Sequence, residues 1–248
     1  LWAWGSNWNG QLGLNDTNDR WGPVQIGSDT NWAQVSAGMS HCLAVKTNGT
    51  LWAWGGNMEG QLGQGSTTPQ KIATPTQVGF DTNWVEAAAG GGFSLARKID
   101  NTVWSWGGNT VGQLGQGNYS TTYLSPTRIG LATDWAQIAA GSSHAIARNT
   151  KGNLWAWGYN WFGQVGDGTF NNNKPSPVQI SFATDWAQVA AGNNHSLARK
   201  NTGGLYAWGY NSFGQLGMGN VNPIYTPTLV PSFACESVRA GCDHTIAR

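Results

Sequence analysis

LWAWGYNWFGQVG, residues 154–166, is the stretch of sequence that decides the fold. Closely similar stretches begin at Leu1 (LWAWGSNWNGQLG), Leu51 (LWAWGGNMEGQLG), Val103 (VWSWGGNTVGQLG) and Leu205 (LYAWGYNSFGQLG). The five starts are 50 to 52 residues apart. A repeat of this length is typical of solenoids and propellers, in which each unit packs against its neighbours.

Each unit contains four short apolar segments separated by Gly, Pro, Asn or Asp, which is the pattern of strands and turns. In the fourth unit the segments are Trp186–Gly192, His195–Arg199, Leu205–Gly209 and Pro227–Val230. The last begins at a proline, which cannot donate to a strand ladder and therefore belongs at a sheet edge. The first is rich in small residues and suits the crowded centre of a ring. A four-stranded sheet repeated radially is a propeller blade, so the sequence predicts a single all-β domain, a β-propeller of four-stranded antiparallel blades, over residues 1–248.

The third segment of each unit carries two large aromatic side chains at alternate positions. Strand alternation places Trp2 and Trp4 on one face of the sheet and Leu1 and Ala3 on the other. Because the pattern recurs in nearly every unit, it favours packing between blades over ligand stacking.

The two ends of the sequence lie at complementary points of the repeat. The chain begins in a third strand and ends in a second strand. We therefore expect the N- and C-terminal strands to pair and close a five-bladed ring, since closure removes exposed sheet edges. The alternative is a segment of a seven-bladed propeller. With no initiator Met and no signal peptide, we expect the chain to be processed or part of something longer.

Composition argues against several classes of function. The net charge is +1 and 10% of the residues are charged, which disfavours a nucleic-acid surface. No apolar run approaches the roughly 20 residues of a membrane span. The cysteines Cys42, Cys235 and Cys242 form no CxxC pair, so a zinc site is not expected. We expect three buried small residues, with one disulfide and a free thiol as the alternative.

The repeat resembles that of the regulator of chromosome condensation family. The resemblance is carried by Trp54-Gly55, Asn57 and Gly60-Gln61-Leu62-Gly63, and by AAGNNHSLA at residues 190–198. It implies a propeller, usually of seven blades, whereas five units are found here. The family includes a nucleotide exchange factor that docks on chromatin, inhibitors of β-lactamase, and bacterial secreted or surface modules. The terse repeats resemble the last group most, so an extracellular or cell-surface location is expected.

The histidines His41, His144, His195 and His244 share one register, which Phe93 occupies in the second unit. A position that accepts Phe is expected to be structural, bonding the local turn, rather than catalytic. No triad, calcium loop or metal motif stands out from the repeat. We therefore predict no enzyme activity, no metal and no cofactor.

Function is expected where the units differ. One variable dipeptide follows the Asn of N-x-x-G-Q, and a second precedes the histidine register. Both turns are expected on one face of the ring, where exposed aromatics would mark an interaction surface; the alternative is that they fold over neighbouring blades. The candidate partner-binding residues are Trp8, Asn9, Met58, Glu59, Thr110, Val111, Trp161, Phe162, Ser212 and Phe213, together with Arg239, a lone cation on a first strand.

The sequence thus predicts a non-catalytic scaffold that binds a protein partner through one face. A carbohydrate-binding module, with Trp8 and Trp161 as stacking platforms for a glycan, is the alternative. An exchange factor for a small GTPase is disfavoured, because no long insertion or basic tail is present.

Overall fold

The structure, a computed structural model, describes all 248 residues as β-strands joined by turns and loops. Four complete sheets follow one another along the chain, and we number them blades 1 to 4. Blade 1 comprises β3 (Trp32–Ala37), β4 (His41–Lys46), β5 (Leu51–Gly56) and β6 (Lys71–Gln77), and blade 2 comprises β7 (Trp84–Ala89), β8 (Phe93–Lys98), β9 (Val103–Gly107) and β10 (Tyr123–Arg128). Blade 3 comprises β11 (Trp135–Ala140), β12 (His144–Asn149), β13 (Leu154–Gly158) and β14 (Lys174–Ser181), and blade 4 comprises β15 (Trp186–Ala191), β16 (His195–Lys200), β17 (Gly204–Gly209) and β18 (Ile224–Ala234).

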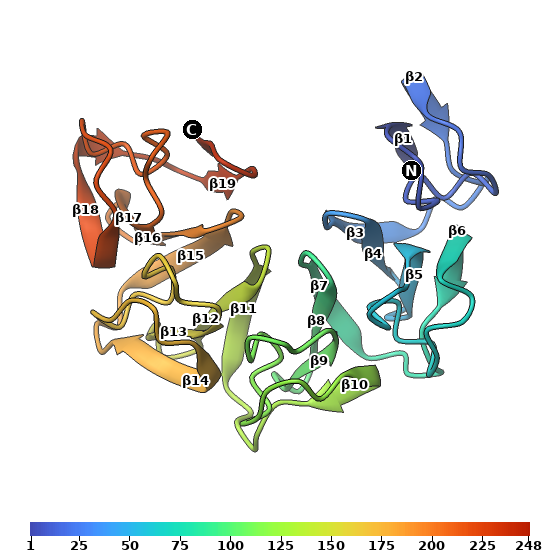
Figure 1. Ribbon diagram of the computed structural model, residues 1–248, viewed down its shortest axis with the longest axis horizontal. Helices are drawn as coiled ribbons and strands as arrows, with labels where there is room; N and C mark the ends of the chain where they lie inside the picture. Colours follow the sequence, from blue (N-terminus) through green and yellow to red (C-terminus); the bar gives the residue numbers. More distant parts are fainter.

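A two-stranded half-blade lies at each end of the chain. The N-terminal half-blade is β1 (Trp2–Gly5) with β2 (Arg20–Gln25), and the C-terminal half-blade is β19 (Val238–Ala240) with β20 (Thr245–Ala247). The blades follow a curve, with the first strand of each blade innermost and the fourth strand at the outer edge (Figure 1). All pairings are antiparallel, which confirms the predicted four-stranded propeller blade.

The fourth strands are longer than the sequence predicts, because each begins before its proline. In blade 4, Ala207 pairs with Thr228 and Gly209 pairs with Ile224, so the register shifts around Pro227. A proline is tolerated at such an irregularity on an edge strand, where no ladder bond is lost. The strand therefore continues through the proline instead of starting there.

The core lies between neighbouring blades, and the second indole of each third strand forms much of it. Trp54, Trp106, Trp157 and Trp208 are buried, and each donates its Nε1–H to a backbone carbonyl of the preceding unit. This confirms the predicted inter-blade packing. The N-terminal half-blade differs, because Trp4, at the corresponding position of β1, is 61% exposed.

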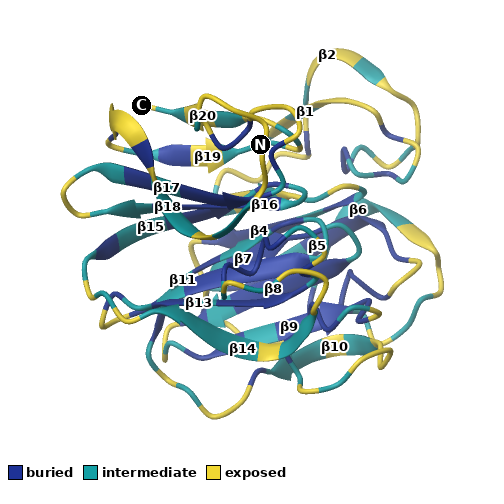
Figure 2. Cartoon of the chain, turned by 60° about the vertical axis from the view of Figure 1, so that its left-hand side comes forward, coloured by how far each residue is buried: buried dark blue, intermediate teal, exposed yellow.

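A belt of side chains also links the inner strands. Gln34 Nε2 donates to the Ala87 carbonyl over 2.8 Å, and Gln34 Oε1 accepts from the Ala87 N–H over 2.8 Å. Gln137 and Gln188 make the same paired contacts to the next blade. Glu86 takes this place in blade 2 and accepts from Ile138 N–H. Buried residues concentrate on the second and third strands of each blade, between the inner strand and the outer edge (Figure 2).

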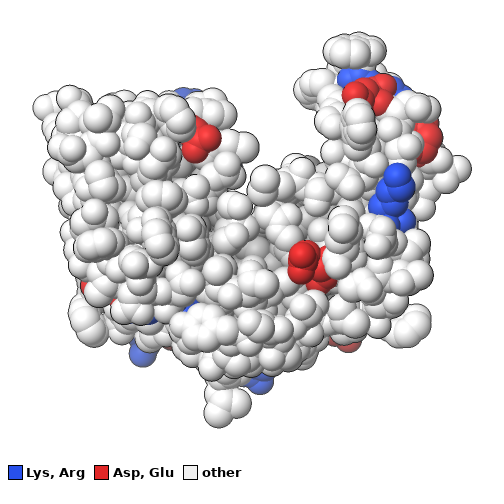
Figure 3. Space-filling model, viewed as in Figure 1, with Lys and Arg blue, Asp and Glu red and all other residues white.

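The expected closure of a five-bladed ring is not formed. β1 pairs only with β2, and β20 pairs only with β19, so the two half-blades are separate sheets. The chain forms an open arc with a notch between its ends (Figures 1 and 3). Because the contacts between neighbouring blades repeat, each blade is rotated in the same sense relative to the one before it. Over these units the rotations do not bring the two half-blades into contact. The seven-bladed alternative remains a prediction.

Candidate functional site

The N-x-x-G-Q motif forms a loop that its own fixed side chains hold in place. In blade 3, the fully buried Asn160 accepts the Val165 N–H at its Oδ1 over 3.0 Å and donates to the Thr169 carbonyl over 3.2 Å. Gln164 Oε1 accepts the Phe162 N–H over 2.9 Å. The other units repeat the Asn and Gln contacts. Because these contacts satisfy backbone groups, the loop keeps its shape whatever side chains the dipeptide carries.

The structure places most of the predicted dipeptides at the surface. The large apolar side chains Trp8, Met58, Trp161 and Phe213 are 75%, 68%, 54% and 71% exposed. Glu59, Thr110 and Ser212 are also exposed, whereas Asn9, Val111 and Phe162 are half-buried. These dipeptides therefore do not as a group fold over the neighbouring blades.

The two sets of variable turns lie on the same face of the arc. Glu59, between β5 and β6, packs over Gly92 in the β7–β8 turn of the next blade. Gln164 Nε2, between β13 and β14, donates to Asn194 Oδ1 in the β15–β16 turn over 3.3 Å. Both kinds of turn thus contribute to one surface, as strand alternation predicts.

Four aromatic rings form a connected row across blades 3 and 4. Tyr159 and Phe162 meet edge to face at 6.4 Å, Phe162 and Tyr210 lie 4.7 Å apart, and Tyr210 meets Phe213 at 6.0 Å. Trp161, beside Phe162, completes what we call the aromatic row: Tyr159, Trp161, Phe162, Tyr210 and Phe213. Sequence reasoning missed the two tyrosines.

The signal for the tyrosines was present in the repeat. They precede the fixed Asn, at a position held by Ser6, Gly56 and Gly108 in the other units. Reading that third variable position with the dipeptide would have found them. The row therefore belongs to blades 3 and 4 alone.

The inner ends of the first strands surround a small pocket of about 180 Å³ at the centre of the arc. Its lining is made of short side chains and glycines together with Met39 and Cys242. Arg239 does not line it. This arginine is exposed on β19 and donates to the Val238 carbonyl of its own strand over 2.9 Å. The structure therefore does not bring Arg239 together with the dipeptides.

The buried histidines join neighbouring blades instead of bonding the local turn. His41 Nε2 lies 2.9 Å from Ser94 Oγ, and His144 Nε2 lies 2.8 Å from Ser196 Oγ. Each serine donates its own proton to a glutamine carbonyl, so the histidine Nε2 must carry the proton that the serine oxygen accepts. Burial lowers the pKa of His41 to about 4 and that of His144 to about 3. These rings are neutral structural links, which agrees with the expected structural role.

Charged groups are mostly used in internal contacts. Lys46 and Lys98 each lie over two indoles and pair with Asp29 and Asp81, a recurring arrangement that the sequence reading missed. The arginine at the end of β8, Arg97, pairs with Glu86 over 2.9 Å. The face seen in Figure 3 accordingly carries few charged side chains.

No three His, Cys, Asp or Glu side chains gather where they could hold a metal ion. All three cysteines are free thiols. Only Cys235 is buried by surface area, Cys42 is half-buried and Cys242 is exposed, so the expectation of three buried residues is wrong for Cys242 and holds only in part for Cys42. Burial raises the pKa of Cys42 to about 12, so its thiol stays protonated. The structure also contains no helix with the length and apolar character of a membrane span.

The molecule is a β-propeller domain, because its four-stranded sheets are arranged radially and buried indoles join neighbouring blades. The variable loops lie on one face of this domain. Comparison with known proteins gives the family. The model of the RCC1-like domain matches residues 1–247, and the chain belongs to that family. The family resemblance expected from the repeat is confirmed.

Similar proteins include longer chains with different activities. The chain is 34% identical over 239 residues to the ultraviolet-B receptor UVR8 of Arabidopsis thaliana, covering 94% of this chain and 54% of the receptor. It is 29% identical over 257 residues to the human E3 ubiquitin-protein ligase HERC2, covering 100% of this chain and 5% of HERC2. The chain thus spans about half of the first relative and a small part of the second.

Solved structures show the same fold. Human WBSCR16 matches with a TM-score of 0.87 and 25% identity, covering 99% of this chain and 66% of that one. Yeast RCC1 (Prp20), solved bound to Kap60, matches with a TM-score of 0.86 and 23% identity, covering 98% and 61%. Both matches show the propeller fold, and this chain covers 66% and 61% of the two longer proteins.

Proposed function

We propose that this protein is a non-catalytic scaffold that binds a protein partner through the face carrying the variable turns, with the aromatic row as its centre. Protein binding is a property of proteins with a similar structure. Yeast Prp20 has been solved with Kap60, and a second Prp20 structure is described with its binding properties to Gsp1p and histones. These partners belong to Prp20.

The observation that carries the proposal is that Trp161 and Phe213 are exposed on loops whose conformation does not depend on these two side chains. Their loops are held by buried Asn and Gln side chains, while the two rings are 54% and 71% exposed. Aromatic side chains of this kind dominate binding energies when a partner covers them. Tyr159, Phe162 and Tyr210 contact one another in sequence, and Tyr210 also contacts Phe213.

Selection of protein ligands from a displayed library, followed by calorimetric titration, tests the proposal. The variant W161A/F213A should lose at least about 100-fold in affinity for ligands selected on the wild-type protein, since two central aromatics contribute roughly 2 kcal/mol or more each. Its melting temperature should not change, because both side chains are exposed.

The matched control is W8A/M58A, which removes similarly exposed apolar side chains from the other end of the same face. It should bind as the wild type does. Equal ligand affinity for W161A/F213A and the wild type would overturn the proposal. The comparisons give no support to the glycan alternative; glycan-array binding that depends on Trp161 would replace the protein partner, and accelerated nucleotide exchange on a small GTPase would restore the exchange-factor alternative.

A further inference from the structure

A lysine at the end of the second strand lies over two aromatic rings in blades 1, 2 and 4. Lys46 Nζ is 4.6 Å from the ring centre of Trp32 and 3.8 Å from that of Trp52. The other two blades repeat the contact at 4.2 to 5.4 Å, with Lys98 over Trp84 and Trp104, and Lys200 over Trp186 and Tyr206. A carboxylate also lies 2.6 to 3.1 Å from each ammonium nitrogen, from Asp29, Asp81 and Asp185. Each of these blades thus holds one ammonium cation by two rings and one acid.

Blade 3 has an asparagine in place of this lysine. Asn149 pairs with Trp135 across β11 and β12, as Lys200 pairs with Trp186 across β15 and β16. The shorter side chain of Asn149 donates from Nδ2 to Asp134 Oδ2 over 3.2 Å. Because an amide carries no charge, the acid of blade 3 has no cationic partner.

The two rings of blade 3 keep the geometry of the lysine-containing blades. Trp135 and Trp155 meet edge to face, with their centres 5.8 Å apart and their planes at 81°. Trp32 and Trp52, the rings under Lys46, meet at 5.9 Å and 80°. The rings of blade 3 are therefore placed to flank a cation, although the blade itself supplies none.

A pocket of about 370 Å³ opens onto these rings at the junction of blades 2 and 3, away from both chain ends (Figure 1). Trp135, Trp155 and Asn149 line it together with Asp134, the only charged residue of its lining. Leu131, which is 88% exposed, also lines the pocket, so a ligand can enter from solvent. The volume is in the range of small-molecule sites.

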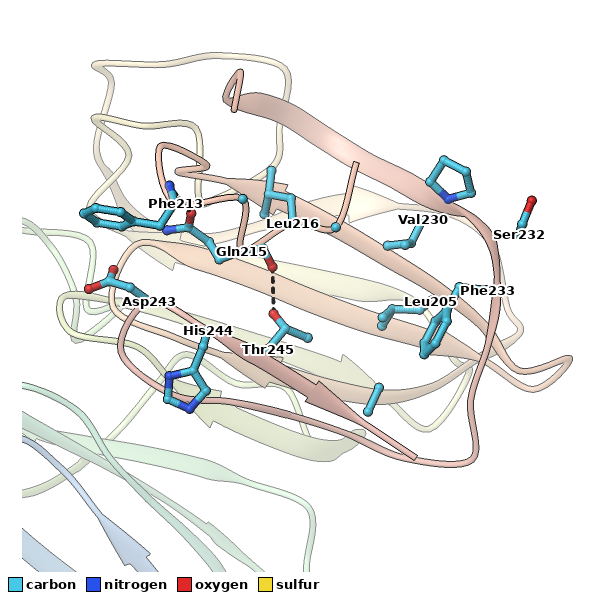
Figure 4. A pocket seen from close by; sticks show the side chains of 14 residues that line it. Leu205, Phe213, Gln215, Leu216, Val230, Ser232, Phe233, Asp243, His244 and Thr245 are labelled. Atoms are coloured by element: carbon cyan, nitrogen blue, oxygen red, sulfur yellow. Dashed lines mark hydrogen bonds between the residues drawn. The ribbon is translucent and has the colours of Figure 1, made fainter. Parts of the chain in front are cut away.

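Two other pockets lack this combination of groups. A groove of about 460 Å³ touches Trp32 and Trp52 in blade 1, where Lys46 already lies over both rings. The pocket of about 510 Å³ beside the C-terminal half-blade has Phe213 and Phe233 at opposite ends, so the two rings cannot flank one cation (Figure 4). Among the four blades, paired rings with an acid and no lysine occur in blade 3 alone.

We propose that this pocket binds an alkylammonium cation, with the ammonium nitrogen over Trp135 and Trp155 and hydrogen-bonded to Asp134. The acceptor is Asp134 Oδ1, which takes no hydrogen bond from the protein. The negative ring faces and the carboxylate both attract the cation, as they do in blades 1, 2 and 4. Such a group can come from a free amine or from a lysine side chain of another polypeptide. No residue of the aromatic row lines the pocket, so the site is independent of the proposed function.

Nuclear magnetic resonance of the full chain, isotope-labelled at nitrogen, tests the proposal. n-Butylammonium chloride, added at constant ionic strength, should shift the indole N–H signals of Trp135 and Trp155 with a dissociation constant of about 1 mM. n-Butanol has a similar shape and no charge, so it should bind at least about tenfold more weakly. The acetylated and amidated peptide GGKGG identifies the source. Binding at least about tenfold tighter than n-butylammonium indicates a polypeptide lysine, and equal affinity indicates a free amine.

The variant Asn149→Lys should abolish binding, because the new side chain takes the place of the ligand as Lys98 does in blade 2. Its melting temperature should equal or exceed that of the wild type, so the loss of binding would not come from misfolding. Asp134→Asn should weaken binding at least about fivefold, since the charge of the acceptor is removed. The variant W161A/F213A is the matched control and should bind n-butylammonium as the wild type does.

Four results would each refute the alkylammonium site. They are the absence of a saturable shift up to about 20 mM n-butylammonium, twenty times the expected constant, equal affinity for n-butanol, undiminished binding by folded Asn149→Lys, and unchanged affinity of folded Asp134→Asn.

Discussion

The hydrogen bond between His144 and Ser196 can be dissected, because the chain contains an apolar version of the same junction. Both side chains are fully buried, and Phe93 and Ala145 take the two places between blades 2 and 3. Ser196→Ala leaves the His144 Nε2–H buried without an acceptor. A buried unsatisfied donor costs about 1–3 kcal/mol, so we expect this variant to lose about 2 kcal/mol of unfolding free energy.

Adding His144→Phe to Ser196→Ala should recover most of that loss. The pair then matches Phe93 and Ala145, and the unpaired donor is gone, so the double variant should lie within about 1 kcal/mol of the wild type. Urea denaturation of the two single variants and the double variant gives the coupling energy. Cys42→Ala is a control at the same register, because the Cys42 thiol contacts the Gln11 carbonyl and no histidine ring, and it should cost less than Ser196→Ala. A stable Ser196→Ala variant, or a double variant less stable than Ser196→Ala, would refute the reasoning.

Three further outcomes follow from the same contacts. The free energy of unfolding should fall as pH is lowered from about 6.5 to about 4, because the unfolded chain binds protons on histidines that stay neutral when buried. Urea titrations across this range should show a smaller decline for the His144→Phe, Ser196→Ala double variant, which lacks one of these histidines. Trp157→Ala should lower the unfolding free energy by about 3–5 kcal/mol, whereas Trp4→Ala should change it by less than about 1 kcal/mol, and equal effects in thermal melts would contradict the junction model. Asn160→Ala should cost about 2 kcal/mol, since it leaves the buried Val165 N–H unpaired, and unchanged amide exchange at Val165 would count against that contact.

The blade could be predicted from the sequence because its signals are local. Alternation within five residues places Trp155 and Trp157 on one face, and the prolines mark an edge strand. The structure confirms both features. The extent of the fourth strand was missed, because the irregularity that accommodates Pro227 depends on its pairing with β17.

Contacts between blades were harder to predict, because their partners lie about 50 residues apart. The histidine register looked like a local turn contact, yet its partner is a serine of the next unit. The sequence contains a clue to this contact. The unit with His41 is followed by a unit with Ser94 at the contacting position, whereas the unit with Phe93 is followed by a unit with Ala145 there. Ring closure was difficult to predict for a related reason. The sequence shows the number of units but not the angle between neighbouring blades.

Most of the predicted dipeptide residues lie at the surface, and their use in binding remains a prediction. The Asn and Gln residues that recur in every N-x-x-G-Q motif indicate a loop whose conformation does not depend on the residues between them. The aromatic row could not be anticipated as a row, because Phe162 and Tyr210 meet only through the packing of blade 4 against blade 3. An extracellular location and bacterial-type repeats also remain predictions.

The glutamine belt on the inner strands ties each sheet only to the next one along the chain. Stability is then a sum of unit and nearest-neighbour terms, as in a linear lattice. Hydrogen exchange should accordingly be slowest at amides such as Ala87 and Val189, which lie in the middle of the belt, and fastest in β1 and β20. Under tension the molecule should unravel from its ends, one sheet at a time, instead of melting as a whole.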